Sequence, residues 1–517
     1  MCDRWSSHLL VFLLLVIWSP EEVKTGRVLV LLPHIGKSHF TAFEPYLRYL
    51  TAVGHDVVVY SHFPLKDPPP NFTDVSLLGS RHQDYATNAI PPFFTLLPLK
   101  AYITAFFFGL GGVVQCAEVL GSKPMQELMK SDEKFDLIVT ELFNSDCVLP
   151  FVHKFGAPHI ALSSCVPVPT SLDRFGNPDS PAYIANMFLP LTNNMNFFER
   201  VSNTLMYLWT KAVFYIMYDI PSELVAWYHF GLSIPRLSSI AYNTSLLLIN
   251  THPVINSPRP YVPSIIEVGG IHLPKVKKLP QDIAKFMDEA EHGVVYVSFG
   301  SLLKIDALPD EKRDAMVHAF ARLKQRVLWR WSSELYERPA NLMTKSWIPQ
   351  FDVLNHPNVK AFVTHSGLLS TIEAVHNAVP VVTIPFFGDQ DHNAKNIVRQ
   401  GIGIQLSYSN LTMENLLNAL NQVIYNISYK ENAIQTSKIF RDRPKSPMET
   451  AVYWTEYVLR HGGAPHLQSA AKELNIFQYL LLDVVAVLLI FSIIVLVVLG
   501  YCFKILLSVL RPKQKLL

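Results

Sequence analysis

Polar residues of the segment 347–390 stand where short apolar runs end, a pattern that could bind a nucleotide. Residues 361–364 and 381–384 are apolar enough to be buried strands, and apolar residues recur between them at helical spacing. His365 ends the first strand, Gly367 lets the backbone approach a ligand, and Ser370 brings a hydroxyl to the first helical turn. Free N–H groups at a helix amino end attract phosphate, so this β-α-β pattern predicts a diphosphate site.

The same segment supplies groups for the rest of a nucleotide sugar. Trp347 offers a flat face for a base, and Glu373 is one turn along the helix, where it can accept hydrogen bonds from a ribose diol. Asp389 and Gln390 follow the second strand and suit sugar hydroxyls. An ordinary buried crossover helix explains the leucines and valines but not these polar residues at the strand ends.

The run W-I-P-Q-F-D-V-L-N-H-P, then A-F-V-T-H-S-G-L-L-S-T-I-E-A and V-P-V-V-T-I-P-F-F-G-D-Q resembles the signature of the UDP-glycosyltransferases. That membrane-bound family glycosylates small lipophilic molecules, and the overall sequence is most similar to that of its insect members. The resemblance implies the glycosyltransferase-B architecture, in which two Rossmann-like domains face a cleft. It also implies nucleotide contacts from Gln350 and the backbone of Ile348. Many relatives carry Asn where this chain has Leu369, so one diphosphate contact differs.

A second diphosphate contact is expected from the opposite wall of the cleft. Residues 294–300 read as a strand, and the Gly300 backbone and the Ser301 hydroxyl follow at its end. Asp389 and Asp391 also spell D-x-D, whose carboxylates could hold a divalent cation against a diphosphate. Their place after a parallel strand favours sugar contacts, with leaving-group charge stabilised by His365 and the helix amino end. We therefore expect no metal and no cofactor, with a UDP-sugar as co-substrate.

The amino-terminal half opens with another β-α-β pattern. Residues 27–33 read as a strand, 34–39 as a loop and 40–53 as a helix. The pattern lacks G-x-G-x-x-G, so it gives no reason to expect a dinucleotide. The resemblance makes His39, in the pair Ser38-His39, the general base, a role that a neutral imidazole suits. His34 is its nearest rival within the loop.

A catalytic histidine usually has a carboxylate that holds its tautomer. The resemblance places an acid after the strand 135–140, where this chain has Glu141 and many relatives have Asp. Asp146 is the alternative, five residues further on. Either could instead cap the following helix.

Two aromatic segments, residues 91–111 and 195–220, are too short or too interrupted to span a membrane cleanly. Lining an apolar acceptor pocket, dipping into a bilayer face and forming ordinary core helices all remain open for them.

Composition and the chain ends point to a membrane. Half of the 517 residues are hydrophobic, and a net charge of +2 without a basic patch argues against nucleic acid. Residues 1–20 read as a signal peptide, and 484–503 form an uncharged run of membrane-spanning length. Basic residues follow it, which places the tail in the cytosol and the body in the lumen. The last five residues fit a dilysine retrieval signal to the endoplasmic reticulum.

Four sequons agree with a lumenal body, whereas the cysteines do not form a disulfide framework. N-glycosylation acceptors occur at Asn71, Asn243, Asn410 and Asn426. Outside the two apolar ends the cysteines are Cys116, Cys147 and Cys165, so at least one of them must stay free of an internal disulfide.

These observations predict two doubly wound α/β domains and one membrane anchor. The expected ranges are a signal peptide (1–25), an acceptor-binding domain (26–252), a linker (253–268), a UDP-sugar-binding domain (269–446), a cross-over and juxtamembrane segment (447–478), a transmembrane helix (479–503) and a cytosolic tail (504–517). The expected function is inverting transfer of a hexosyl group, favoured to be glucose, to a hydroxyl of a small lipophilic acceptor, for detoxification or inactivation. A silent lumenal carrier of lipophilic ligands and a transferase acting on lipid are the alternatives. Homo-oligomers remain open.

Overall fold

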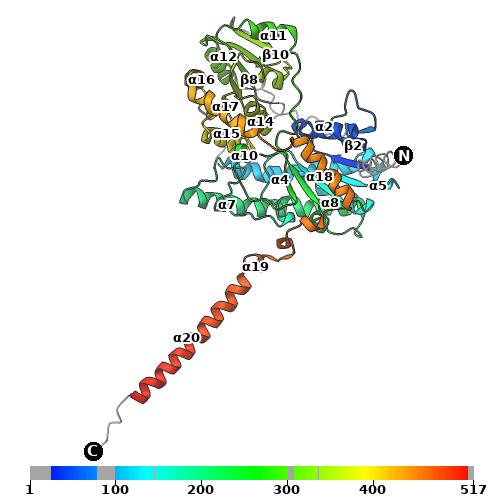
Figure 1. The fold of residues 1–517 in the computed structure, drawn as a ribbon, viewed down its shortest axis with the longest axis vertical. Helices are drawn as coiled ribbons and strands as arrows, with labels where there is room; N and C mark the ends of the chain where they lie inside the picture. Colours follow the sequence, from blue (N-terminus) through cyan, green and yellow to red (C-terminus); the bar gives the residue numbers. More distant parts are fainter. Residues whose placement is uncertain (1–24, 79–98, 145, 301–307, 336, 511–517) are drawn as a thin grey trace, which may run out of the picture.

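Two parallel β-sheets, each covered by helices, form the body of the protein in a computed structural model (Figure 1). The structure describes residues 25–78, 99–144, 146–300, 308–335 and 337–510. Most of the expected signal peptide, Ser301 and the basic end of the tail lie outside these residues. A single long helix extends away from the body toward the carboxyl end.

The first sheet has seven parallel strands in the order β3-β2-β1-β4-β5-β6-β7. The apolar runs predict these strands well: β1 reads R-V-L-V-L-L, and Val28, Leu29 and Val30 are completely buried. Its strands are β1 (Arg27–Leu32), β2 (Asp56–Ser61), β3 (Phe72–Ser76), β4 (Leu137–Glu141), β5 (His159–Ser163), β6 (Leu246–Ile249) and β7 (Ile265–Glu267).

The second sheet has six parallel strands in the order β10-β9-β8-β11-β12-β13. Its core is again apolar on both faces, as expected of strands covered by helices on each side. The strands are β8 (Val294–Ser298), β9 (Arg326–Arg330), β10 (Leu342–Lys345), β11 (Val359–Thr364), β12 (Val381–Thr383) and β13 (Gly403–Gln405).

Helices cover both sheets and hold the site residues at their amino ends. In the first domain they are α2 (Lys37–Ala52), α4 (Lys100–Gly121), α5 (Lys123–Lys130), α6 (Pro150–Phe155), α7 (Phe197–Phe214), the π-helix η4 (Tyr215–Asp219), α8 (Ile220–Phe230), α9 (Leu237–Tyr242) and α10 (Pro253–Asn256). In the second they are α11 (Gln281–Asp288), α12 (Asp310–Ala321), α13 (Gln350–Leu354), α14 (Leu368–His376), α15 (Gln390–Arg399), α16 (Met413–Tyr425) and α17 (Ile427–Arg441).

The first sheet extends into the range expected to be a linker. Residues 253–268 contain α10 and then β7, which pairs with β6 as the edge strand of the first sheet. Four prolines within residues 253–263 had suggested an irregular connection, but Ile265 is buried against that sheet. We therefore place the connection between the domains after Glu267.

The chain returns to the first domain through α18 (Pro447–His461), as expected for a cross-over helix. A capping box between Ser446 and Glu449 starts this helix, and Gly462 in the left-handed conformation ends it. The Tyr46 hydroxyl of α2 lies 2.6 Å from the Thr455 hydroxyl of α18, and both groups are buried. Helix α18 thus completes the core of the first domain.

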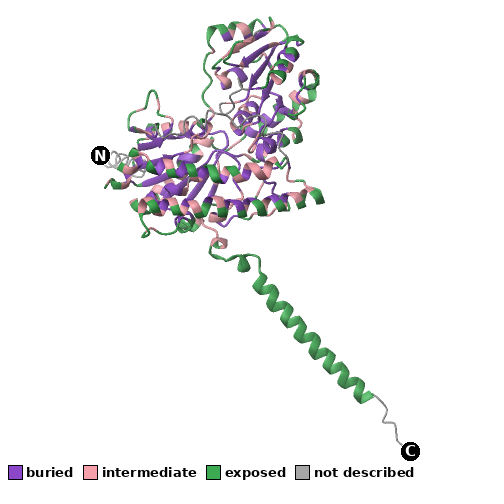
Figure 2. Ribbon diagram, turned by 180° about the vertical axis from the view of Figure 1, so that it is seen from behind, coloured by how far each residue is buried: buried purple, intermediate pink, exposed green. Residues whose placement is uncertain are grey.

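Beyond α18 come α19 (Ile476–Tyr479) and α20 (Leu482–Leu510), the isolated helix of Figures 1 and 2. Among the described residues, two helices are long and apolar enough to cross a membrane, α4 and α20. Helix α4 is two-fifths buried within the first domain over its most apolar window, whereas α20 is exposed throughout. Helix α20 is therefore the candidate span, and it continues beyond the end expected at residue 503.

The first domain contains one disulfide and one free cysteine, and the sequon asparagines lie on the surface. Cys116 of α4 forms a disulfide with Cys147, and Cys165 is free and buried. The four sequon asparagines, Asn71, Asn243, Asn410 and Asn426, are all exposed.

Candidate active site

The first half of the candidate site stands at the carboxyl ends of β1, β4 and β5. His39 lies in the first turn of α2, which begins at Lys37, three residues earlier than the sequence suggested. Gly36 is its N-cap and accepts a hydrogen bond from the His39 amide (3.0 Å). The base candidate is thus part of a helix rather than of a loop, which restricts its backbone.

Glu141 ends β4 and lies against the His39 ring. The distance from His39 Nδ1 to Glu141 Oε1 is 2.5 Å, and the Glu141 side chain is almost completely buried. Ser164, directly after β5, lies 2.9 Å from the same Nδ1 and donates to Glu141 Oε1 at 3.0 Å. These contacts occupy Nδ1 of His39 and leave Nε2 as the ring nitrogen that can take a proton from a ligand.

An aromatic wall surrounds His39. The His34 ring centroid lies 3.9 Å from that of His39, and the Phe143 centroid lies 4.2 Å from it. Burial, and then the neighbouring His39 and His62, lower the pKa of His34 well below its ordinary value, so His34 is neutral. A Cβ added at Gly36 would lie 2.8 Å from His34 and 3.0 Å from His39, so only glycine lets both rings pack here.

His34, His39 and Glu141 also form the one group of three possible metal ligands found in the described part of the chain. Their ligand atoms lie within 4.8 Å of one another. Because His39 and Glu141 already bind each other, the arrangement suits proton transfer.

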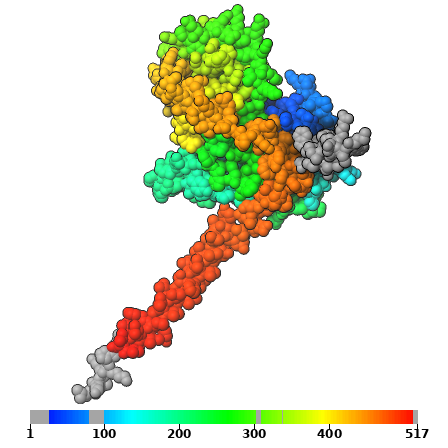
Figure 3. Space-filling view, viewed as in Figure 1, coloured from blue at the N-terminus to red at the C-terminus, as the bar shows by residue number. Residues whose placement is uncertain are grey.

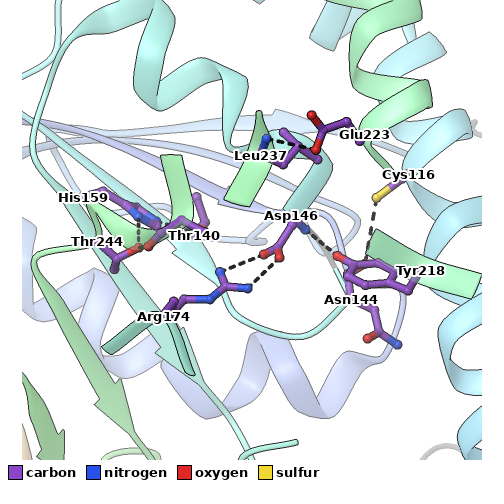
Figure 4. Close-up of polar contacts among 11 residues, drawn as sticks. Cys116, Thr140, Asn144, Asp146, His159, Arg174, Tyr218, Glu223, Leu237 and Thr244 are labelled. Carbon is purple, nitrogen blue, oxygen red and sulfur yellow. Dashed lines mark hydrogen bonds and ion pairs between the residues drawn. The ribbon is translucent and has the colours of Figure 1, made fainter. Parts of the chain in front are cut away.

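Asp146, the alternative partner for His39, has different contacts. Both of its carboxylate oxygens accept from Arg174, at 3.1 and 2.6 Å, in a largely buried ion pair (Figure 4). Its amide donates to the Tyr218 hydroxyl at 2.6 Å. Asp146 therefore connects the segment after β4 to Arg174 and Tyr218, while Glu141 contacts the histidine.

The second half of the site is built around His365, which ends β11. Added Cβ atoms at Gly367 and Gly300 would lie 2.5 and 2.7 Å from its ring, so two glycines make room for it. Burial, and then Arg330, lower the pKa of His365 to about 4. The imidazole is therefore neutral and offers a hydrogen bond rather than a positive charge.

The turn between β11 and α14 prepares an anion site. Ser366 has a φ of 65°, in the left-handed region, and Gly367 caps α14 without any side-chain bond to the first-turn amides. These N–H groups and the helix dipole are open to an oxyanion. Many relatives carry Asn at position 369. The Leu369 of this chain packs instead against the core of the first domain.

Gln350 connects the residues expected to hold a ribose. Its amide donates to Ser370 at 3.0 Å and to Glu373 at 2.6 Å. Burial raises the pKa of Glu373 to about 7, against the lowering effect of the Gln350 contact. Nearby, Ile348 is buried in the core, whereas Trp347 leaves two-thirds of its surface exposed, so its ring is available to a base.

The end of β12 and the start of α15 supply the acids. Asp389 accepts from Asn393 at 2.9 Å, and Gln390 uses its side-chain oxygen to accept from the Phe386 amide at 2.8 Å. Asp391 pairs with Lys100 of α4 at 2.6 Å, across the two domains. The two acids of D-x-D thus have different partners.

Asp389 also faces the first half of the site. Burial raises the pKa of its carboxyl, while the Asn393 amide and then an electrostatic interaction with His39 lower it. The sugar-contact candidate of one domain is therefore within electrostatic range of the base candidate of the other.

Three residues of this arrangement were missed from the sequence. Ser164 contacts both His39 and Glu141, Lys100 reaches Asp391, and Arg330 donates to the Gly300 carbonyl at 2.7 Å beside His365. Ser164 and Arg330 each stand at the carboxyl end of a strand, the signal that identified His365. Ser301 lies outside the described residues.

Comparisons with known proteins find similar sequences and a similar fold. The family model described as "UDP-glucoronosyl and UDP-glucosyl transferase" matches residues 101–516. UDP-glycosyltransferase UGT5 of Dactylopius coccus is 41% identical over 93% of this chain and 92% of its own length. UDP-glucosyltransferase 2 of the same insect is 39% identical over 90% of each chain.

A solved structure shares the fold. The crystal structure of a UDP-glucose: anthocyanidin 3-O-glucosyltransferase in complex with UDP aligns with a TM-score of 0.56 at 17% identity. The alignment covers 84% of this chain and 99% of the other.

Proposed function

The chain belongs to the UDP-glucuronosyl and UDP-glucosyl transferase family, and on that premise we propose that it transfers a hexosyl group from a UDP-sugar to a hydroxyl of a small lipophilic acceptor with inversion. Membership makes it a glycosyltransferase that uses UDP-sugars. Glucose as the sugar, a lipophilic acceptor and a role in detoxification or inactivation are the proposal's finer parts. The observation that carries it is the contact of His39 with the buried Glu141 and with Ser164, which occupies Nδ1 and leaves Nε2 for an acceptor proton.

His39 acts as the general base in this proposal. Glu141 and Ser164 occupy Nδ1, so Nε2 takes the acceptor proton as the acceptor oxygen attacks the anomeric carbon. The sugar–phosphate bond breaks on the opposite side, UDP leaves and the configuration inverts. The buried Glu141 carboxylate stabilises the imidazolium that forms.

The second domain holds the donor. The amino end of α14 and the His365 ring receive the diphosphate and stabilise the charge that develops on UDP. Glu373 accepts from the ribose, Trp347 stacks on uracil, and Asp389 and Gln390 bind sugar hydroxyls. We propose no metal in this step, because Asp391 is neutralised by Lys100.

We also propose a place for the enzyme. Helix α20 anchors the body to the endoplasmic reticulum membrane, with the catalytic domains in the lumen. The apolar helix, the exposed sequons and the Cys116–Cys147 disulfide support this orientation, since disulfides form in oxidising compartments.

The test is acceptor-dependent release of UDP by microsomes that contain the full chain. UDP-glucose, UDP-glucuronate and UDP-galactose are each supplied with a pool of phenols and other lipophilic alcohols. We expect release with UDP-glucose, and we expect His39→Ala to abolish it while UDP binding persists.

Each outcome separates the proposals. Activity with UDP-glucuronate alone would overturn the choice of sugar. Equal release by His39→Ala would place the base elsewhere. Silence with every donor, with UDP still bound, would favour a carrier of lipophilic ligands.

A further inference from the structure

Helix α15 lies at the boundary between the two domains, and its first turns are enclosed by both of them. Residues 391–394 are all buried, and Asp391 reaches Lys100 of α4 in the first domain. Figure 1 shows α15 beside α10, and in Figure 3 the yellow surface of this part of the chain meets the green surface of the first domain. The start of the helix carries Asp389 and Gln390, the proposed sugar contacts, so any shift of α15 moves both of them.

The buried side of α15 is mostly polar, which is the informative kind of burial. Its buried polar residues are Gln390, Asp391, His392, Asn393 and Asn396. The Asn396 amide donates to His392 Nε2 at 3.1 Å, and Asn396 Oδ1 accepts from the Ser257 hydroxyl at 2.8 Å. A buried amide is costly unless both of its ends are paired, so these two contacts fix the position of the helix against its neighbours.

Ser257 brings the first domain into this network. It ends α10, the short helix that the chain forms between β6 and β7 of the first sheet, and it is almost completely buried. Its φ of 67° lies in the left-handed region, which is unfavourable for a residue with a Cβ. Such a conformation persists only where the surrounding structure enforces it, so the Ser257 hydroxyl is held rigidly toward Asn396.

His392 makes a second connection to the first domain. Burial, and then the charge of Arg259, lower the pKa of His392 to about 4, against a backbone contact from Leu191 that raises it. The ring is therefore neutral, and because its Nε2 accepts from Asn396, its proton is on Nδ1. Leu191 belongs to the same apolar cluster as Phe143, whose ring packs against the base candidate. Helix α15 thus contacts the side of the first domain that holds the base.

The same helix is tied to the diphosphate turn within its own domain. The Asn393 amide donates to the Ser366 carbonyl at 3.1 Å and to Asp389 at 2.9 Å. Ser366 directly precedes the amino end of α14, where the diphosphate is proposed to bind. One side of α15 therefore contacts the donor site, while another contacts the first domain.

We propose that Asn396 is a positioning residue, which through Ser257 and His392 fixes the helix that presents the two sugar contacts to the reaction. It acts through the helix rather than by touching the sugar. The inference rests on the proposed function, because it requires Asp389 and Gln390 to bind the transferred sugar.

The proposal separates the sugar from the nucleotide. The proposed nucleotide contacts lie on other elements: Trp347 precedes α13, Glu373 lies on α14 and His365 follows β11. A shift of α15 should therefore weaken the binding of a UDP-sugar much more than the binding of UDP. It should also lower kcat, because the sugar is no longer held in line between the acceptor at His39 and the leaving UDP.

The test compares wild type with Ser257→Ala, Asn396→Ala and the double variant, each as the full chain in detergent. Calorimetry measures the affinities for UDP, UDP-glucose, UDP-glucuronate and UDP-galactose, and acceptor-dependent UDP release gives kcat. Asn341→Ala is the matched control, because its amide donates to three carbonyls inside the second domain, those of Phe320, Leu323 and Gln325. The Tm of each variant shows that it is folded at the assay temperature.

We expect affinity for the UDP-sugar that wild type binds most tightly to fall about tenfold in Asn396→Ala and about fivefold in Ser257→Ala, as loss of buried hydrogen bonds would cause. The double variant should be no weaker than Asn396→Ala, since the Ser257 contact is already absent there. Affinity for UDP should stay within about twofold of wild type, and kcat should fall in parallel with UDP-sugar affinity. Asn341→Ala should lower Tm alone.

Three results would overturn the positioning role. They are unchanged UDP-sugar affinity in Asn396→Ala and Ser257→Ala, an equal loss of UDP affinity in both, and the same loss of UDP-sugar affinity in Asn341→Ala. Transfer by wild type would leave the proposed function standing in each of these cases. Conversely, a wild type that transfers no sugar would refute the proposed function, while a selective loss of UDP-sugar affinity in the variants would still support the role of Asn396. Should Asn396→Ala fail to fold, Ser257→Ala decides the question by the same measurements.

Discussion

Replacing Glu141 by glutamine tests the base assignment directly. The His39–Glu141 contact is 2.5 Å and the carboxylate is buried, so the imidazolium formed in turnover meets an unscreened negative charge. Opposite unit charges about 4 Å apart at an effective dielectric of about 20 attract by about 4 kcal/mol. Glutamine keeps a hydrogen-bond acceptor, so we expect the barrier to rise by about 2–4 kcal/mol, which lowers kcat about 30- to 1000-fold.

Asp146→Asn is the matched control. It removes the same kind of charge a few residues away, but its partner is Arg174 rather than His39. Breaking a buried ion pair costs about 3–5 kcal/mol of stability because one charge stays buried alone. We therefore expect a lower Tm with kcat of the folded enzyme within about threefold of wild type.

The assay measures kcat at saturating donor and acceptor, UDP affinity by calorimetry and Tm for both variants. Glu141→Gln should leave UDP affinity unchanged, since Glu141 lies in the first domain and the second domain is proposed to bind UDP. A kcat for Glu141→Gln within threefold of wild type would refute the reasoning. So would a hundredfold loss in Asp146→Asn at a temperature where it is folded.

Three further predictions concern the donor. Burial raises the pKa of Glu373 to about 7, so the carboxylate that accepts from ribose is present above that pH and is lost as the pH falls through it. The donor KM should therefore rise severalfold from pH 8 to pH 6. Glu373→Gln should flatten this dependence of KM on pH. Gly367→Ala places a Cβ 2.5 Å from the His365 ring and should weaken UDP binding about 10- to 100-fold, as loss of a hydrogen bond to a charged group would, measured by calorimetry. Lys100→Ala and Asp391→Asn each break an ion pair whose lysine side chain is one-third exposed, so each should raise the donor KM by at most about fivefold. The double variant should have a donor KM no higher than that of either single variant. Strictly additive effects on KM would mean that the pair does not act as a unit.

Much of this arrangement could be predicted because parallel strands place their carboxyl ends together. His39 and Glu141 lie beyond the carboxyl ends of β1 and β4, which are neighbours in the sheet, and it was the family resemblance that singled them out, with Asp146 as an alternative to Glu141. His365 and Gly367 were identified from the strand-end pattern itself. Short-range patterns determine these positions.

Other features depend on distances that no local pattern encodes. Lys100 and Asp391 are 291 residues apart, and nothing near either residue indicates its partner. A serine after a strand is common, so its position at a strand end did not distinguish Ser164 from other serines of the chain. The turn signals at the four prolines hid β7, because a three-residue edge strand is too short to show a period.

The return of α18 to the first domain has a consequence for synthesis. Ala451, Val452 and Val458 belong to the core that α2 and the first sheet form, so this domain is assembled from two parts of the chain separated by the whole second domain. During translation the first sheet must wait, with part of its apolar surface uncovered, until α18 has emerged from the ribosome. Helix α20 begins about twenty residues after α18 ends, so the first domain is completed shortly before the proposed anchor leaves the ribosome. If α20 is the anchor, completion of the fold and attachment to the bilayer are coupled in time.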